Sequence, residues 1–206
     1  MKVLVACEFS GIVREAFRAK GHDAWSCDLL PTEIPGQHIQ GDVLEIINNG
    51  WDMMIAHPPC TYLCVTANRS FLNNPDRWRL RLDAMIFVYK LLNADINKIC
   101  LENPKGVISS HIRKPEQYIQ PYEYGHPTSK ITGLWLKNLP QLVPTDIIEP
   151  EWVYYPSGKR MSKMHANSPS TNNPENAKLR SRTYQGIAKA MANQWTGQNA
   201  PLEAIV

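Results

Sequence analysis

A thiol in a proline-rich loop is the first feature of the sequence that could carry chemistry. Cys60 ends the tetrapeptide His57-Pro58-Pro59-Cys60, which directly follows the apolar run at residues 51–56. Two prolines cannot continue a strand or enter a helix interior, so they stiffen the chain as it leaves the predicted strand. Open α/β sheets build their sites at the carboxyl ends of their strands. A soft nucleophile held there is suited to covalent attack on an electrophilic carbon, whereas the simpler interpretation is a turn with a small buried cysteine.

A carboxyl group follows a second apolar run. Glu102 comes directly after residues 98–101, and neighbouring strands of a doubly wound sheet would bring it close to Cys60. A thiol that attacks carbon 6 of a pyrimidine is assisted when ring nitrogen 3 is protonated or hydrogen-bonded. A carboxyl group whose pKa is raised by burial can supply that proton, and carbon 5 then becomes nucleophilic enough to take a methyl group from a sulfonium. The alternative for a single glutamate at a strand end is a salt bridge.

The turns after the first three predicted strands describe a nucleoside-cofactor cleft. Gly11 lies in the first turn, without the full Gly-x-Gly-x-x-Gly of a dinucleotide site. Asp28 ends the second strand and could accept hydrogen bonds from a ribose. Asp42, beside Gly41, could bind an amine or a base edge. Each acid could instead cap a helix or lie in a solvated turn. Because a diphosphate cradle is missing, the pattern favours S-adenosylmethionine over a dinucleotide.

The elements that must position these residues alternate between strand and helix, which predicts a doubly wound α/β sheet. Strands are predicted at residues 3–7, 23–28, 52–56, 98–101 and 132–136, with residues 41–43 as a third strand end or the turn after it; helices are predicted from Ser10, as N-cap, to Gly21, from 74 to 92 and from 175 to 195. We expect residues 1–139 to form a catalytic core and residues 140–175 to form an irregular loop or a small substrate-contacting region. We expect residues 176–195 to form a C-terminal helix that packs on the core, and residues 196–206 to be a loose tail.

Composition sets the compartment and the partners that we expect. The chain has 206 residues, five cysteines without framework spacing and a net charge of +3. These values indicate one domain with at most a small appendage, free thiols in a reducing cytoplasm, and no requirement for a nucleic-acid partner. With no signal peptide and no apolar run of membrane-spanning length, we expect a cytoplasmic protein without a membrane partner. Two basic segments, 159–165 and 178–182, are either solvated or contact phosphates.

The motifs together resemble the DNA cytosine-5 methyltransferases. Over about the first 110 residues, the order and rough spacing match in Phe9-x-Gly11, Asp28, Gly41-Asp42-Val43, Pro59-Cys60 and Glu102-Asn103. The resemblance is stronger to short, phage-type proteins of this kind, which share His-Pro-Pro-Cys, Glu-Asn-Pro and a run like Gly125-His126-Pro127-Thr128-Ser129-Lys130-x-Thr132-x-Leu134-Trp135-Leu136.

The resemblance implies a fold, a reaction and a set of roles. The fold is a Rossmann-like methyltransferase sheet, in the cytoplasm of a bacterial host if a phage encodes the chain. The reaction is S-adenosylmethionine-dependent methylation of carbon 5 of cytosine in DNA. Cys60 would be the nucleophile and Glu102 the partner of ring nitrogen 3. The cofactor would lie among Phe9, Gly11, Asp28, Asp42 and Pro58.

The sequence departs from the family where the substrate is held. Thr61 replaces the usual Gln and Pro104 the usual Val, and the Gln-x-Arg-x-Arg motif and a large target-recognition domain are missing. The candidate substrate-binding residues are therefore His57, Asn103, Lys130, Arg160 and Arg182. Single-stranded DNA, RNA, a free nucleotide or specificity supplied by a partner all stay open.

Other interpretations of the same loop also stay open. His57, Cys60, Cys64 and Cys100 could hold zinc, although their spacing fits no common finger, and we expect no metal. The tetrapeptide is also similar to the Asp/Asn-Pro-Pro-Tyr/Phe motif of amino-methyltransferases. There His57 would accept the amine proton and Tyr62 would stack on a flipped base. A third possibility is an inactive methyltransferase-like domain that binds nucleic acid or a host protein.

Overall fold

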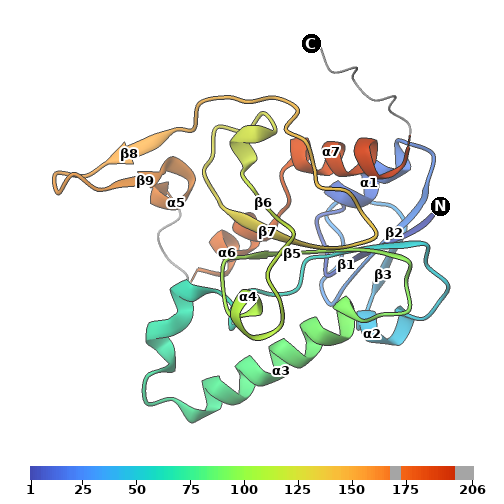
Figure 1. Ribbon diagram of the computed structural model, residues 1–206, viewed down its shortest axis with the longest axis horizontal. Coiled ribbons are helices and arrows are strands. Elements are labelled where there is room, and N and C mark those ends of the chain that lie inside the picture. Colours follow the sequence, from blue (N-terminus) through green and yellow to red (C-terminus); the bar gives the residue numbers. More distant parts are fainter. Residues whose placement is uncertain (168–172, 198–206) are drawn as a thin grey trace.

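A seven-stranded sheet forms the centre of the computed structural model, which describes residues 1–167 and 173–197 (Figure 1). The strand order is β3-β2-β1-β4-β5-β7-β6, with β1 to β5 parallel and β7 antiparallel to both of its neighbours. The strands are β1 (Lys2–Ala6), β2 (Asp23–Asp28), β3 (His38–Gln40), β4 (Met53–Ala56), β5 (Lys98–Pro104), β6 (Gln117–Ile119) and β7 (Thr132–Lys137). Chain order reverses between β1 and β4, so the predicted doubly wound, Rossmann-like sheet is confirmed, and its topological switch point lies at the carboxyl ends of these two strands.

Helices cover both faces of the sheet. In Figure 1, α1 and α7 lie on one face and α2, α3 and α4 on the other. The helices are α1 (Ile12–Arg18), α2 (Val43–Ile46), α3 (Pro75–Leu92), α4 (Ile108–His111), α5 (Lys163–Asn167), α6 (Pro174–Ser181) and α7 (Gln185–Trp195), with 3₁₀ helices η1 (Val65–Phe71) and η2 (Pro121–Glu123). A short hairpin of β8 (Trp152–Tyr154) and β9 (Arg160–Ser162) projects from the main sheet.

The core follows from the alternation of side chains along buried strands. Val3 and Val5 of β1 pack in the cluster that includes α1 and α7, whereas Leu4 and Ala6 pack in the cluster that includes α3. A strand that is covered on both faces has to be apolar at every position, which is the pattern that predicted β1 from the sequence. Within the described ranges, no helix is long and apolar enough to cross a membrane.

Two predicted helix boundaries are wrong. Ser10 is not the N-cap of α1: that position is Gly11, at φ 75°, and the free N–H groups of Val13 and Arg14 donate instead to the carboxylate of Glu8, at 2.7 and 3.2 Å. The single helix predicted from 175 to 195 is two helices, α6 and α7, because the chain is extended between them.

The other predicted boundaries are confirmed in part. Of the two alternatives for residues 41–43, the turn after β3 holds for Gly41 and Asp42, whereas Val43 begins α2. The region 140–175, predicted as irregular, contains the β8–β9 hairpin and α5. The division of the chain at residues 139 and 175 stays a prediction. Most of the predicted tail, residues 198–206, lies outside the described residues.

Candidate active site

The sheet brings the two predicted reactive motifs side by side. Ala56 of β4 pairs with Leu101 of β5, so the residues that follow them meet at the same edge. His57 Nδ1 lies 2.6 Å from Glu102 Oε2, and one residue further along, Asn103 Nδ2 donates to the carbonyl oxygen of Pro58 at 2.8 Å. The predicted adjacency of the fourth and fifth strands is therefore confirmed, and the loop that carries Cys60 is tied to the strand that carries Glu102.

Glu102 is ionised, contrary to the expectation that burial would raise its pKa. Burial does oppose the charged carboxylate, but the hydrogen bond and charge of His57, with a contribution from Lys130, lower the pKa of Glu102 below its ordinary value of 4.5. Burial likewise opposes a charged imidazole, but Glu102 and the charge of Glu8 raise the pKa of His57 above 6.5. The two side chains are only 8% and 16% exposed. They form a buried, hydrogen-bonded histidine–glutamate pair. The expectation of a raised pKa for Glu102 is corrected by this partner, which comes from the neighbouring strand.

Cys60 is a protonated thiol at neutral pH. A hydrogen bond with the Cys64 thiol and burial raise the pKa of Cys60 well above 9.0, and the charge of Lys130 only partly opposes them. The two cysteines are joined by one helical turn, in which the Cys64 N–H donates to the Cys60 carbonyl oxygen at 3.0 Å. Because the thiolate is the nucleophilic form, attack by Cys60 requires loss of its proton as the new bond forms.

Of the three basic candidates for substrate binding, Lys130 is the one that lies close enough to influence the reactive side chains. The charge of Lys130 affects the pKa values of Cys60, His57 and Glu102. Its Nζ donates to the carbonyl oxygen of Arg180 at 2.8 Å, which places the α6 end beside the site.

The other two basic candidates are engaged elsewhere. Arg160, on β9, stacks on the Trp152 ring at 4.2 Å. Arg182 Nη2 forms an ion pair with Glu33 Oε1 at 2.8 Å. The structure therefore does not bring Arg160 or Arg182 into contact with the reactive pair.

The predicted cofactor residues surround the end of β1. Phe9 is buried, with the Lys178 ammonium 5.3 Å from its ring centre. Asp28 is partly buried; burial raises its pKa, although the hydrogen bond that it accepts from the Leu30 N–H at 2.9 Å opposes the shift. Asp42 caps α2, since its Oδ1 accepts from the Leu44 N–H at 2.9 Å. Asp28 is thus the acid with the more protected position, and Asp42 has a structural role as well.

Glu8 is a functional candidate that the sequence analysis missed. Its carboxylate accepts three hydrogen bonds, two from the first-turn N–H groups of α1 and one from Ser10 Oγ at 3.1 Å. It is 4% exposed and lies close enough to raise the pKa of His57. An acid directly after a buried strand was the available signal, the same one that singled out Asp28 and Glu102.

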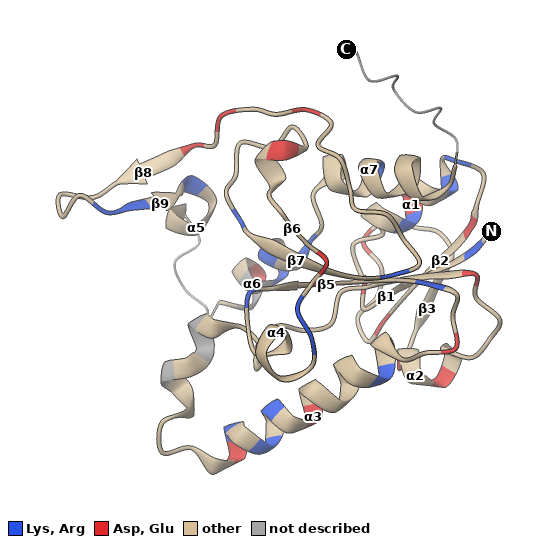
Figure 2. Ribbon diagram, in the orientation of Figure 1, with Lys and Arg blue, Asp and Glu red and all other residues tan. Residues whose placement is uncertain are grey.

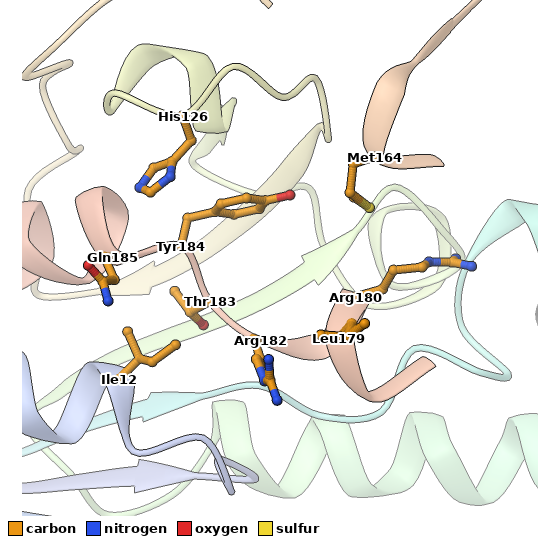
Figure 3. Close-up of a pocket in the computed structure, with 9 residues that line it drawn as sticks. All are labelled: Ile12, His126, Met164, Leu179, Arg180, Arg182, Thr183, Tyr184 and Gln185. Carbon is orange, nitrogen blue, oxygen red and sulfur yellow. The ribbon is translucent and has the colours of Figure 1, made fainter. Parts of the chain in front are cut away.

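A pocket of about 390 Å³ lies next to this region, between α1, α5, α6 and the start of α7 (Figure 3). Figure 3 shows the rings of His126 and Tyr184 close together, with centroids 5.1 Å apart, and His126 Nε2 accepts the Gly186 N–H at 2.9 Å. Of the predicted site residues, only Arg182 lines it; the complete lining is Ile12, His126, Met164, Leu179, Arg180, Arg182, Thr183, Tyr184 and Gln185. In the described part of the chain, no three His, Cys, Asp or Glu side chains are grouped to hold a metal ion.

Fold and site together define a Rossmann-like α/β protein with a thiol and a His–Glu pair at the carboxyl ends of β4 and β5, beside the switch point of its sheet. No family model matches the sequence, and no curated protein matches it. Among solved structures, the chain is similar to a prophage-encoded protein of E. coli whose own assignment as a DNA modification methyltransferase is provisional. The identity is 18% and the TM-score 0.48, over 71% of this chain and 51% of that chain. The present chain thus spans about half the length of that protein, and the likeness concerns the fold alone.

Proposed function

We propose that the protein is an S-adenosylmethionine-dependent methyltransferase that acts on carbon 5 of cytosine in nucleic acid, with DNA as the expected substrate, through a covalent adduct with Cys60. The observation that carries the proposal is the meeting of the Cys60 loop with the ionised Glu102 at the ends of β4 and β5. A nucleophile and a base-orienting carboxylate are the two groups that this chemistry requires from the protein.

The first turn of α1 supports a sulfonium cofactor over a dinucleotide. A helix N-terminus binds a diphosphate through its free N–H groups, but here the carboxylate of Glu8 already accepts from two of them. Its negative charge repels a diphosphate and favours a cation. Phe9, Gly11 and Asp28 would hold the nucleoside, with Asp28 accepting hydrogen bonds from the ribose. When bound, S-adenosylmethionine supplies the methyl group.

The residues at the strand ends have separate roles in the reaction. Cys60 Sγ bonds to carbon 6 as the thiol proton passes to a water molecule, and the electron pair of the carbon 5–carbon 6 double bond moves to carbon 5, which becomes nucleophilic. After methyl transfer, a water molecule takes the carbon 5 proton, the electron pair of that C–H bond re-forms the double bond, and the Sγ–carbon 6 bond breaks to release the Cys60 thiolate, which is then reprotonated. An ionised Glu102 accepts the hydrogen bond of the cytosine amino group and holds the ring over Cys60. His57 keeps Glu102 ionised and fixes its orientation.

Covalent trapping tests this function. A 5-fluorocytosine oligonucleotide with cofactor should form a stable adduct with the wild-type protein, because fluorine cannot leave carbon 5 as a proton does. Cys60→Ser should form none, since a hydroxyl stays protonated without a base. Cys64→Ser is the matched control and should still be trapped, because it keeps the Cys60 thiol. Methylation that persists in Cys60→Ser, with no adduct in the wild type, contradicts the proposal.

One observation favours a second candidate, a methyltransferase for an exocyclic amine. The raised pKa of Cys60 weakens it as a nucleophile, while an ionised acceptor such as Glu102 suits an amine that must lose a proton. That enzyme would tolerate Cys60→Ser and lose activity in His57→Ala. The position of the methyl group, read by mass spectrometry of the product nucleoside, separates the two.

A further inference from the structure

An arginine–aromatic cluster lies beside the active-site loop, formed by Tyr62, Phe71, Arg77, Trp78 and Arg81. The Arg81 guanidinium lies 3.6 Å from the centre of the Phe71 ring, and the Trp78 ring meets Phe71 edge-on with centroids 5.4 Å apart. Arg77 lies over the Tyr62 ring at 5.0 Å. Tyr62 is two residues beyond Cys60, so the cluster is continuous with the reactive loop.

Three members of the cluster, Phe71, Trp78 and Arg81, line a pocket of about 350 Å³. The opposite wall comes from the chain that leaves Glu102, because Gly106, Val107, Ser110 and His111 line it. The loops that leave Cys60 and Glu102 are joined directly: Cys64 pairs with Gly106, and the Val107 N–H donates to the Leu63 carbonyl oxygen at 2.8 Å. The pocket is therefore built from the same two loops as the candidate active site.

Arg81 is a buried cation without an acidic partner. It is 6% exposed, and its N–H groups donate to the Tyr62 carbonyl oxygen at 2.8 Å and to Asn68 Oδ1 at 3.0 Å. In residues 1–167 and 173–197, neither Arg81 nor Arg77 forms an ion pair with a carboxylate. Buried charges in proteins are normally paired. Arg81 lines the pocket and Arg77 lies beside it, over the Phe71 ring at 5.2 Å, so this pair of arginines indicates a ligand that carries an anion.

We propose that this pocket binds the nucleotide adjacent to the target cytosine, an inference that rests on the proposed function. Its base stacks on Trp78, whose ring is half exposed, and its phosphate lies against Arg77 and Arg81. Aromatic rings with neighbouring arginines are the usual platform for unstacked bases of a single strand, and they tolerate any base. The pocket thus binds the nucleic-acid strand next to the reacting nucleotide without a large recognition domain.

Binding of a short single-stranded oligodeoxynucleotide, labelled with fluorescein and containing one cytosine, tests the proposal by anisotropy without cofactor. Trp78→Ala should bind about 5- to 150-fold more weakly, the range measured for loss of one base-stacking aromatic, and Arg77→Gln should reduce the salt dependence. Tyr89→Ala is the matched control: Tyr89 is another exposed aromatic of α3 but does not line the pocket, and its variant should bind like the wild type.

An abasic scan assigns the nucleotide. Removing the base next to the cytosine should weaken binding to the wild type but not further weaken binding to Trp78→Ala. Equal affinity of Trp78→Ala and wild type, or an equal loss in Tyr89→Ala, overturns the proposal. Anisotropy needs no turnover, so the two proposals can fail separately. If binding depends on Trp78 but no adduct forms, only the proposed reaction is wrong. If the adduct forms but binding does not depend on Trp78, only this inference is wrong. A wild-type protein that binds no oligonucleotide defeats both.

Discussion

The partner of Glu102 determines which bases the site can accept. A protonated glutamic acid could donate to ring nitrogen 3, but the carboxylate that His57 maintains can only accept. Cytosine presents an amino group at the position where uracil and thymine present a carbonyl oxygen. If the proposed function is correct, an ionised Glu102 would select an amino-bearing base and reject one that offers a second acceptor, because two facing acceptors leave a buried charge unsatisfied.

The His57–Glu102 pair should stabilise the fold within a defined pH window. The pKa of His57 is raised, so its contribution is complete below 6.5 and is lost as pH rises through its folded value. The pKa of Glu102 is lowered, so its contribution is present above 4.5 and is lost as pH falls through its folded value. A double-mutant cycle with His57→Gln and Glu102→Gln, followed by urea unfolding, should give a coupling of about 2 kcal/mol near pH 6. The coupling should shrink at pH 9; a coupling independent of pH contradicts an ionic pair.

Asp28 should contribute to cofactor affinity more than its neighbours do. Asp28→Asn should weaken binding of S-adenosylmethionine by about 1–3 kcal/mol, because a charged acceptor is lost from a partly desolvated site. Isothermal calorimetry measures this directly. Asp23→Asn, at the exposed start of the same strand, is the control and should bind normally. A wild-type protein that binds neither the cofactor nor its demethylated product favours an inactive binding domain instead.

At the scale of elements, the break between α6 and α7 shows where sequence patterns stop being informative. The periodicity of residues 175–195 is that of one helix, and nothing local forbids it. The chain is extended at Arg182 and Tyr184 because Arg182 pairs with Glu33 and Tyr184 packs on His126. Both partners are distant in the chain, so the break could be found only in the folded protein.

The start of α7 should be intolerant of any side chain at Gly186. A Cβ atom there would lie 1.8 Å from the Tyr124 carbonyl oxygen, and backbone cannot yield as a side chain can. Gly186→Ala should therefore destabilise the protein by about 2–3 kcal/mol in urea unfolding. Gly41→Ala is the control, since nothing lies within 4 Å of its Cβ position. If the two variants unfold at the same urea concentration, α7 does not pack against the Tyr124 loop as described.

For the whole molecule, the sequence predicts those strands and helices that depend on local pattern, and those neighbours that follow from the general geometry of sheets. The buried strands β1 and β4 and the first part of β5 are apolar runs. The helix α3 begins at Pro75 with Asn74 as its N-cap, an ordinary capping signal. The parallel arrangement of the strands was enough to place Cys60 near Glu102. Each strand of the β8–β9 hairpin has only three residues, of which Ser162 alone is buried, so the hairpin has no such pattern. The pairing of His57 with Glu102 links side chains 45 residues apart, which only the folded sheet reveals.

The last prediction concerns charge, because basic bands lie on α6 and on the hairpin of β8 and β9 (Figure 2). Lys163 pairs with Glu151 at 2.9 Å, but Lys159 and Arg160 form no ion pair with any described residue. Neither charge is neutralised by a carboxylate in the described part of the chain, and the stacking of Arg160 on Trp152 leaves its charge available to a phosphate. Replacing both with Gln should flatten the dependence of log affinity on log salt for single-stranded DNA by about 1.4, or about 0.7 per lost contact.

Lys20→Gln with Lys98→Gln removes two charges near the amino-terminal edge of the sheet and serves as the control for net charge. An equal change in both double variants shows that only overall charge matters, and an unchanged slope in the hairpin variant shows that Lys159 and Arg160 are merely solvated.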